Sequence, residues 1–218
     1  MSALIVHHLE QSRSQRVLWL LEELGVDYEL KLYSRSRAGR APRELYEVHP
    51  LGRSPVITHD GRTLAESGAI VEYLLDTFGQ GRMRPQPETE DLDRYRFFMH
   101  FAEGSMTAPL LVKLITSRLS QAVPLLGKGI ARRIDQSYTD PQLALHLKYV
   151  ESALEGRQWL AGELSGADVM MCYPLEASIT RSGIAGDFPN IRAYLARIGQ
   201  RSAWQRAIER GGAMLLGG

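Results

Sequence analysis

Hydrophobic and polar positions in the first part of the chain alternate between the spacing of strands and that of helices. Successive apolar residues within Ala3–His8 predict a buried strand. Helical spacing over Gln15–Leu24 predicts a helix, and Gly25 stands where a left-handed C-terminal cap is expected. Tyr28–Tyr33 carries its hydrophobic side chains on one face and predicts a second strand. The chain therefore begins with the order strand, helix, strand.

A short helix and a hairpin are predicted next. Pro42 opens a short helical pattern at the first position, where its missing N–H is tolerated. Two strand patterns, Pro55–Thr58 and Thr63–Leu64, flank the dipeptide Asp60-Gly61. Because this dipeptide favours a two-residue turn, the two segments are predicted to pair as an antiparallel hairpin.

The periodicity changes after a helix that Ser67 is placed to cap and that ends near Gly79. Gly79–Glu88 is rich in glycine and proline, has no periodicity and is typical of a linker. No strand pattern follows it. Helical spacing recurs in Thr89–Ser117 with interruptions around Gly104 and Pro109, and in Pro141–Leu154, Ala167–Arg181, Ile191–Ile198 and Ala203–Glu209. The pattern sets no boundaries within Val123–Asp140.

These patterns predict a mixed architecture, an α/β unit followed by an all-α unit. We expect the α/β unit over residues 1–80, a linker over 81–87 and the all-helical unit over 88–218. At 218 residues the chain is long enough to bury a substantial core without disulfides.

Composition excludes several classes of protein. The single cysteine, Cys172, rules out an internal disulfide framework, a CxxC redox pair and a multi-cysteine zinc site. The formal net charge of +1 argues against a nucleic-acid surface, and no apolar run approaches the roughly 18 residues of a membrane span. Neighbouring His7 and His8 point to opposite faces of a strand, so we expect no metal site there. The amino-terminal segment does not resemble a secretion signal, and we expect a cytoplasmic protein.

Ser12 is the first residue that suggests chemistry. It lies in Glu10–Arg16, between the first strand and the first helix. Free N–H groups and a partial positive charge at a helix N-terminus stabilise an anion, and a thiolate is an anion. The alternative is that Ser12 or Ser14 simply caps the helix. No nucleophile-elbow motif surrounds Ser12, so it is not predicted to attack a substrate covalently.

Two further segments have both a functional and a structural interpretation. Pro55 lacks an N–H and starts a strand, so the backbone beside it is available to an extended peptide-like ligand. An ordinary turn at Arg53-Ser54-Pro55 is the alternative. Glu66 and Ser67 at a helix start suit the ammonium and carboxylate of an amino acid, although Ser67 as a plain cap explains the same pattern. Together with Ser12 they suit a tripeptide with a thiol.

The motifs resemble those of the cytosolic glutathione S-transferases whose catalytic residue is serine, the theta- and beta-like members found in bacteria and fungi. The resemblance covers nearly the whole chain. It rests on S-x-x-x-R at Ser12 and Arg16, HPLGRSPV at 49–56, LAESGAI at 64–70 and LAGELSGADVM at 160–170. It implies a thioredoxin-like first domain, an all-helical second domain that carries the hydrophobic substrate site, a homodimer, and a structural cap at Ser165 and Asp168.

The resemblance also implies the roles of individual residues. Ser12 would activate the glutathione sulfur, Ser54 would offer its backbone to the cysteinyl part, and Pro55 would follow a cis bond. Glu66 and Ser67 would hold the γ-glutamyl head. Arg53 and, as a weaker candidate, Arg40 would lie near the glycyl carboxylate. Glu103 would reach the glutathione amine, either across a subunit interface or within the chain. The family often has a branched apolar residue before the proline, where this chain has Ser54.

The activity implied is conjugation of glutathione to an apolar electrophile, with glutathione as co-substrate, no other cofactor and no metal. Peroxide reduction, dehalogenation or isomerisation on the same fold is one alternative. A non-catalytic interaction module is another. Cys172 is expected to be buried and chemically inert. Trp19 and Trp204 are expected to serve packing.

Overall fold

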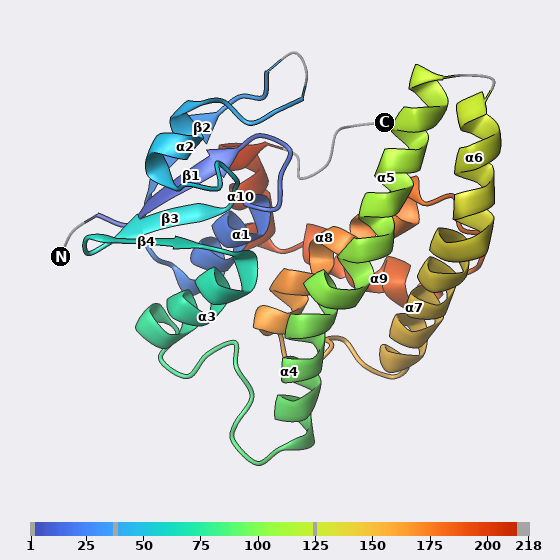
Figure 1. Ribbon diagram of the computed structural model, residues 1–218. Coiled ribbons are helices and arrows are strands. Elements are labelled where there is room, and N and C mark those ends of the chain that lie inside the picture. Colours follow the sequence, from blue (N-terminus) through green and yellow to red (C-terminus); the bar gives the residue numbers. More distant parts are fainter. Residues whose placement is uncertain (1–2, 37–38, 124–125, 213–218) are drawn as a thin grey trace.

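The computed structural model describes residues 3–36, 39–123 and 126–212 (Figure 1). Its sheet contains β1 (Ile5–Leu9), β2 (Glu29–Tyr33), β3 (Val56–His59) and β4 (Arg62–Ala65) in the spatial order β2-β1-β3-β4. β1 pairs in parallel with β2 and antiparallel with β3, which in turn pairs antiparallel with β4. The strand at the centre, β1, is therefore buried over most of its length.

Three helices complete this unit, namely α1 (Gln15–Leu24), α2 (Glu44–Val48) and α3 (Ser67–Phe78). The resulting order of elements matches the sequence prediction and is that of a thioredoxin-like domain. Gly25 adopts a left-handed conformation at the end of α1, with φ 69°. In the hairpin, Asp60 and Gly61 both have positive φ, as the two-residue turn requires.

The remainder is helical. Its elements are α4 (Glu90–Phe101), η1 (Ala102–Met106), α5 (Thr107–Ala122), α6 (Leu126–Ile134), η2 (Asp135–Thr139), α7 (Asp140–Ala153), α8 (Gly166–Arg181) and α9 (Pro189–Gly199). Figure 1 shows α4 and α5 as one long rod, with α8 between this rod and the sheet. The predicted interruption at Gly104 is a π-helical turn, η1, and Pro109 is the third residue of α5, shortly after that turn.

The last described helix, α10 (Ser202–Gly211), returns to the first unit and packs along α1 (Figure 1). Trp19 of α1 and Trp204 of α10 meet edge to face with ring centroids 5.2 Å apart, which agrees with the packing role expected for both. A side chain at Gly211 would clash with Gln15 and Leu18 of α1. A residue with a Cβ at this position would therefore require these two side chains to move.

The predicted cap at the start of α8 is present. The Ser165 N–H donates to Asp168 Oδ2 at 2.8 Å, and Oδ1 of the same carboxylate accepts the Leu160 N–H at 3.0 Å. Burial raises the pKa of Asp168 to about 6, against the lowering effect of these hydrogen bonds. Ser165 and Asp168 thus fix the start of α8 and belong to the folding of the chain.

Candidate functional site

A cavity of about 270 Å³ opens where β1 and β2 end. It is lined by Leu9, Gln11, Ser12, Arg13, Arg35, Ala41, Gly52, Arg53, Ser54 and Tyr173. Parallel strands bring their carboxyl ends to one edge of a sheet, and α1 starts at this edge, so the loops after β1 and β2 form one wall. The segment before β3 and Tyr173 of α8 form the others. The cavity therefore lies between the α/β unit and the helical unit, and both line it.

Ser12 lies at this cavity immediately before α1. Its side chain is almost fully buried, and its carbonyl accepts the Gln15 N–H at 3.2 Å. Ser14, not Ser12, occupies the N-cap position of the helix, and no side-chain cap bond is made there. Ser12 is thus not the N-cap residue, although its Oγ accepts the Ser14 N–H at 3.2 Å just before the helix begins. The N-terminal dipole of α1 lies directly behind it.

The Ser12 hydroxyl begins a chain of hydrogen bonds that leads away from the cavity. Ser12 Oγ and Ser14 Oγ are 2.7 Å apart, and Ser14 Oγ lies 2.8 Å from His8 Nδ1. On the far side of the ring, His8 Nε2 lies 2.9 Å from the carbonyl oxygen of Gly211 in α10. Ser14 and His8 are buried. This series of hydrogen bonds thus runs from the cavity wall past the start of α1 and through β1 to α10.

The Ser54–Pro55 bond is cis, as the family resemblance predicts. Ser54 uses its side chain to hold the segment before β3 against β1. Its Oγ donates to the His7 carbonyl at 3.0 Å and accepts the Leu9 N–H at 3.3 Å. The polar side chain that departs from the family pattern therefore continues the β1–β3 pairing past Val56. Ser54 also lines the cavity.

The cavity is cationic. Three arginines, Arg13, Arg35 and Arg53, line it, and none of its lining residues is acidic. The Arg35 guanidinium donates to the carbonyls of Glu10, Gly39 and Gln11, which holds the loops after β1 and β2 together. Arg53 is exposed, and its guanidinium has no hydrogen-bond partner among the residues the structure describes. The field in the cavity therefore favours an anionic ligand.

The start of α3 differs from the prediction that Ser67 caps this helix. Glu66 occupies the N-cap position of α3 with a φ of 73°, a conformation that costs energy for a residue other than glycine. Ser67 is the first helical residue, and its buried Oγ accepts a hydrogen bond from Arg16 Nη2 at 3.1 Å. Because this hydroxyl is occupied by a guanidinium, it does not cap the helix.

The Glu103 carboxylate is held by two arginines of the same chain. Its Oε2 pairs with Arg13 Nη1 at 2.6 Å, and its Oε1 pairs with Arg16 Nη2. Burial would raise the pKa of Glu103, but the charges of Arg16 and Arg13 outweigh it and lower the pKa. Glu103 is therefore ionised at neutral pH. A role toward the glutathione amine stays a prediction. Arg40 is exposed and is not part of the cavity lining.

Comparison with known proteins decides the family. The family model for the glutathione S-transferase N-terminal domain matches residues 1–76. The chain is 32% identical over 212 residues to glutathione S-transferase 3 of Schizosaccharomyces pombe, covering 95% of this chain and 87% of that protein. It is 31% identical over 223 residues to glutathione S-transferase 1 of Saccharomyces cerevisiae, covering 96% and 95%. The chain belongs to the glutathione S-transferase family.

A solved glutathione S-transferase from Actinobacillus pleuropneumoniae extends this likeness to the whole fold. It is 36% identical in sequence, superposes with a TM-score of 0.83, and the match covers 97% of this chain and 94% of that one. The family inferred from the motifs is thereby confirmed. The assignment to serine-type members remains a prediction that depends on Ser12.

Sequence reasoning missed several residues of this glutathione S-transferase site. Arg35 and Tyr173 carry no local signal, because only the fold brings them to the cavity. His8 was assigned a structural role from its place in a strand. The spacing of Ser12 and Ser14 around the turn into α1 was the one clue to a linked pair of hydroxyls.

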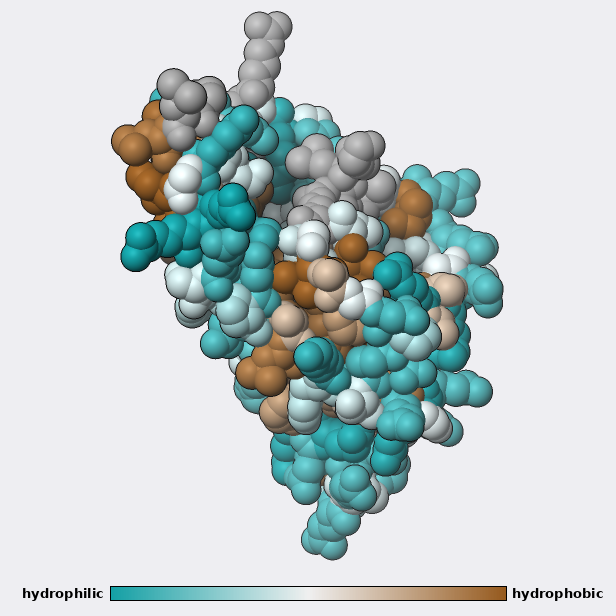
Figure 2. Space-filling view, turned by 90° about the vertical axis from the view of Figure 1, so that its right-hand side faces the viewer, coloured by the Kyte–Doolittle hydropathy of each residue, from teal (hydrophilic) through white to brown (hydrophobic). Residues whose placement is uncertain are grey.

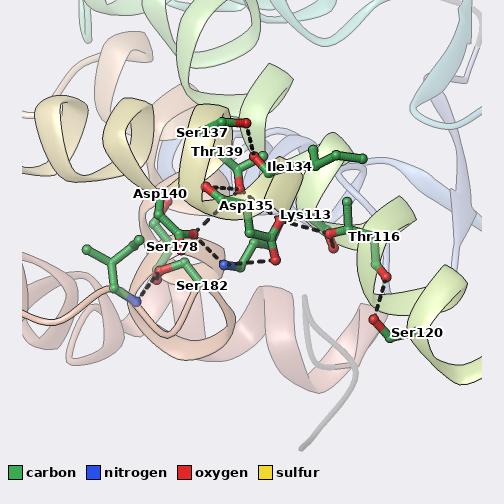
Figure 3. A network of polar contacts seen from close by, with 11 residues as sticks. Lys113, Thr116, Ser120, Ile134, Asp135, Ser137, Thr139, Asp140, Ser178 and Ser182 are labelled. Carbon is green, nitrogen blue, oxygen red and sulfur yellow. Dashed lines mark hydrogen bonds and ion pairs between the residues drawn. The ribbon is translucent and has the colours of Figure 1, made fainter. Parts of the chain in front are cut away.

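A second polar network lies in the helical unit, away from the cavity. Figure 3 shows Lys113 of α5 pointing toward Asp135 and Asp140. Oδ1 of Asp135 accepts hydrogen bonds from the hydroxyls of Thr116 and Thr139, each at 2.9 Å. These contacts tie α5 to η2 and to the start of α7. We therefore assign the network to the packing of the helices, since Lys113 is paired with both aspartates.

Cys172 is buried in α8, and burial raises the pKa of its thiol to about 12. It is therefore inert, as expected. Over residues 3–36, 39–123 and 126–212, no group of three or more His, Cys, Asp or Glu side chains could hold a metal ion. No helix in the same ranges is both long and apolar enough to cross a membrane.

Proposed function

We propose that this protein is a glutathione S-transferase that conjugates the glutathione thiolate to apolar electrophiles. The observation that carries the proposal is the position of Ser12, whose hydroxyl lies at the N-terminus of α1 and in the wall of a cationic cavity. Glutathione carries two carboxylates, and its sulfur becomes anionic in the reaction. A site that stabilises negative charge at the sulfur and at the peptide ends matches that chemistry.

Each part of glutathione has a complementary group at the cavity. The backbone of Ser54, before the cis bond to Pro55, suits the cysteinyl residue by strand-like pairing. The exposed guanidinium of Arg53 suits the glycyl carboxylate. The γ-glutamyl head is assigned to Glu66 and to the α3 N-terminus at Ser67. Arg40 is a weaker candidate for the glycyl end, because it does not line the cavity.

In the proposed reaction the protein lowers the pKa of the glutathione thiol and positions the thiolate. Ser12 donates a hydrogen bond to the thiolate and does not form a covalent intermediate. Holding the thiolate beside the electrophile supplies much of the remaining acceleration. Leu9, Ala41 and Tyr173 give the cavity an apolar edge against which the second substrate would lie.

The helical unit, over residues 88–218, is proposed to carry the hydrophobic substrate site and to contribute to a homodimer. Figure 2 views the side on which α6 and α7 lie, and hydrophobic side chains gather near the middle of this face. The exposed large hydrophobic residues on α5 to α7 are Leu111, Leu114, Ile115, Val123, Leu126, Ile130, Tyr138, Leu145 and Tyr149. Such a concentration is typical of a surface that a partner or an apolar substrate covers.

The deciding experiment measures binding and turnover in the same preparation. Titration calorimetry with glutathione should give saturable heat, and a chloronitrobenzene should be conjugated at a rate that depends on enzyme concentration. Absence of binding at millimolar glutathione would remove the proposal. Binding without conjugation would favour peroxide reduction, dehalogenation or isomerisation, which are assayed with the matching substrates. Failure of all of these would leave a non-catalytic module.

Cell fractionation tests the proposed cytoplasmic location, and sedimentation tests the dimer.

A further inference from the structure

For a neutral His8 ring, the hydrogen bonds around it give one consistent direction to the protons between Ser12 and His8. A carbonyl oxygen only accepts, so His8 Nε2 must carry the proton in its contact with Gly211. In the neutral ring Nδ1 is then unprotonated and accepts the Ser14 hydroxyl proton across 2.8 Å. Ser14 has one hydroxyl proton, and its contact with Nδ1 is shorter than its 3.4 Å contact with the Leu9 carbonyl. With that proton directed to Nδ1, the proton between the two serines belongs to Ser12.

The Ser12 oxygen is therefore an acceptor toward the cavity when His8 is neutral. Its own proton points to Ser14 Oγ, and one lone pair accepts the Ser14 N–H at 3.2 Å. The remaining lone pair is left for a ligand that donates. A thiol donates and a thiolate does not, so this arrangement fits glutathione before its sulfur is ionised.

We propose that Ser12, Ser14 and His8 form a relay that carries the glutathione thiol proton to His8. The inference rests on the proposed function, because it requires the sulfur to lie at Ser12. In the relay the S–H bond breaks and its proton joins Ser12 Oγ. The former Ser12 proton passes to Ser14 Oγ, and the former Ser14 proton passes to His8 Nδ1. Neutral thiol and neutral imidazole become thiolate and imidazolium, so charge and atoms balance.

Every donor is satisfied after the transfer. The imidazolium donates from Nε2 to the Gly211 carbonyl and from Nδ1 to Ser14, Ser14 donates to Ser12, and Ser12 donates to the thiolate. The hydroxyl that accepted from the thiol has become the donor that stabilises its anion. After the product leaves, the relay works in reverse. The proton passes from His8 through Ser14 and Ser12 to water in the cavity.

The surroundings of His8 keep the ring neutral before glutathione binds, and they oppose the imidazolium unless a thiolate forms with it. Burial lowers the pKa of His8, while the Gly211 carbonyl and the charge of Glu10 oppose this effect. Gln15, which approaches the same side of Gly211 from α1, is uncharged, and the residue opposite on β2 is Leu32. His8 is therefore uncharged at neutral pH, and the thiolate formed by transfer would then stabilise the imidazolium.

The test asks where the thiol proton goes. Ultraviolet absorption measures how much bound glutathione is thiolate, and calorimetry in buffers of different ionisation enthalpy measures how many protons are released on binding. S-methylglutathione, which has no thiol proton, gives the background release from other groups. We expect thiolate near neutral pH with almost no proton release above this background. Release of about one proton per thiolate from the unmodified protein would overturn the inference.

Two variants interrupt the relay at different points. His8→Gln replaces the base with a neutral hydrogen-bonding group, and Ser14→Ala removes the central hydroxyl without removing a helix cap bond. Both should release about one proton per thiolate formed and raise the apparent pKa of the bound thiol by about one unit or more. Wild-type behaviour in a folded His8→Gln protein would also contradict the relay.

His7→Gln is the matched control. His7 is a buried neighbour on the opposite face of β1, where its ring nitrogens lie 2.9 Å from the Tyr33 hydroxyl and 3.4 Å from the Thr58 hydroxyl, not beside Ser12 or Ser14. Its substitution removes an imidazole from the same strand and should leave proton release and the thiol pKa unchanged. A protein that binds neither glutathione nor S-methylglutathione would instead refute the proposed function, which separates the two failures.

Discussion

The guanidinium of Arg16 donates a hydrogen bond from Nη1 to the Met170 carbonyl at 2.7 Å and so joins α1 to α8. The Arg16 side chain is fully buried. Its other polar contacts are the Ser67 hydroxyl at the start of α3, the Glu103 carboxylate of η1 and the Arg13 carbonyl. One residue thus links the helix behind Ser12 to the helical unit and to the proposed γ-glutamyl site.

Replacing Arg16 with methionine should strongly destabilise the protein. The substitution keeps an apolar stem but leaves the Glu103 carboxylate half paired and the Met170 carbonyl without its donor, at an expected cost of about 3–5 kcal/mol. Urea denaturation followed by circular dichroism measures this loss. Arg13→Met is the control, since the Arg13 side chain is 32% exposed and its pair with Glu103 should contribute about 1 kcal/mol or less. Equal losses in the two variants would contradict the central role of Arg16.

Replacing Ser12 with alanine should separate binding from turnover. Glutathione affinity should be nearly unchanged, because the peptide is held by other groups, while turnover at neutral pH should fall about tenfold or more with loss of the hydrogen bond to the thiolate. Steady-state kinetics at varied glutathione gives both quantities. Ser120→Ala, on α5 and away from the cavity, should behave as wild type. Unchanged turnover in Ser12→Ala would remove Ser12 from the mechanism.

The two arginines proposed for the glycyl end should differ. Arg53→Gln removes an exposed cation that lines the cavity and should weaken glutathione binding by about tenfold, the effect of one charge-assisted contact. Arg40→Gln removes a cation outside the cavity lining and should change affinity much less. Calorimetry at low and at moderate salt measures both. If Arg40→Gln weakened binding more, the glycyl end would lie at the loop after β2.

Glu103 should contribute to the dependence of stability on pH. Against the raising effect of burial, its pKa in the folded chain is lowered below the ordinary glutamate value of 4.5 by the charges of Arg16 and Arg13. A carboxyl whose pKa is lowered by folding stabilises the protein above the unfolded-state pKa, and this contribution disappears as the pH falls through the folded-state value. The free energy of unfolding should therefore fall below about pH 4.5 more steeply in wild type than in Glu103→Gln. Parallel curves in acid titration would contradict this.

Local patterns predicted most of the fold because most elements have their own signal, whereas α6 and η2 lie in a segment where the pattern set no boundaries. The turn at Asp60-Gly61 and the cap at Gly25 need nothing beyond neighbouring residues, and both are present in the structure. Ser67 was assigned wrongly as a cap because its hydroxyl is occupied by Arg16, and no pattern near Ser67 reveals a partner 51 residues earlier in the chain.

The candidate site was predicted only where motifs are local. Ser12 and Ser54 were found from short segments, and both line the cavity. Arg35 and Tyr173 were missed because they reach it only through the tertiary fold. His8 was classified from strand alternation alone, which says which face a side chain takes but not what it meets there.

The contact between His8 and Gly211 joins residues 203 positions apart. During synthesis on the ribosome, the strand that bears His8 emerges long before the helix that supplies its carbonyl partner. The amino-terminal unit can acquire its sheet early, yet the orientation of its imidazole ring waits for nearly the whole described polypeptide. A nascent chain halted before α10 would therefore hold a serine at the right place without a set direction for its proton.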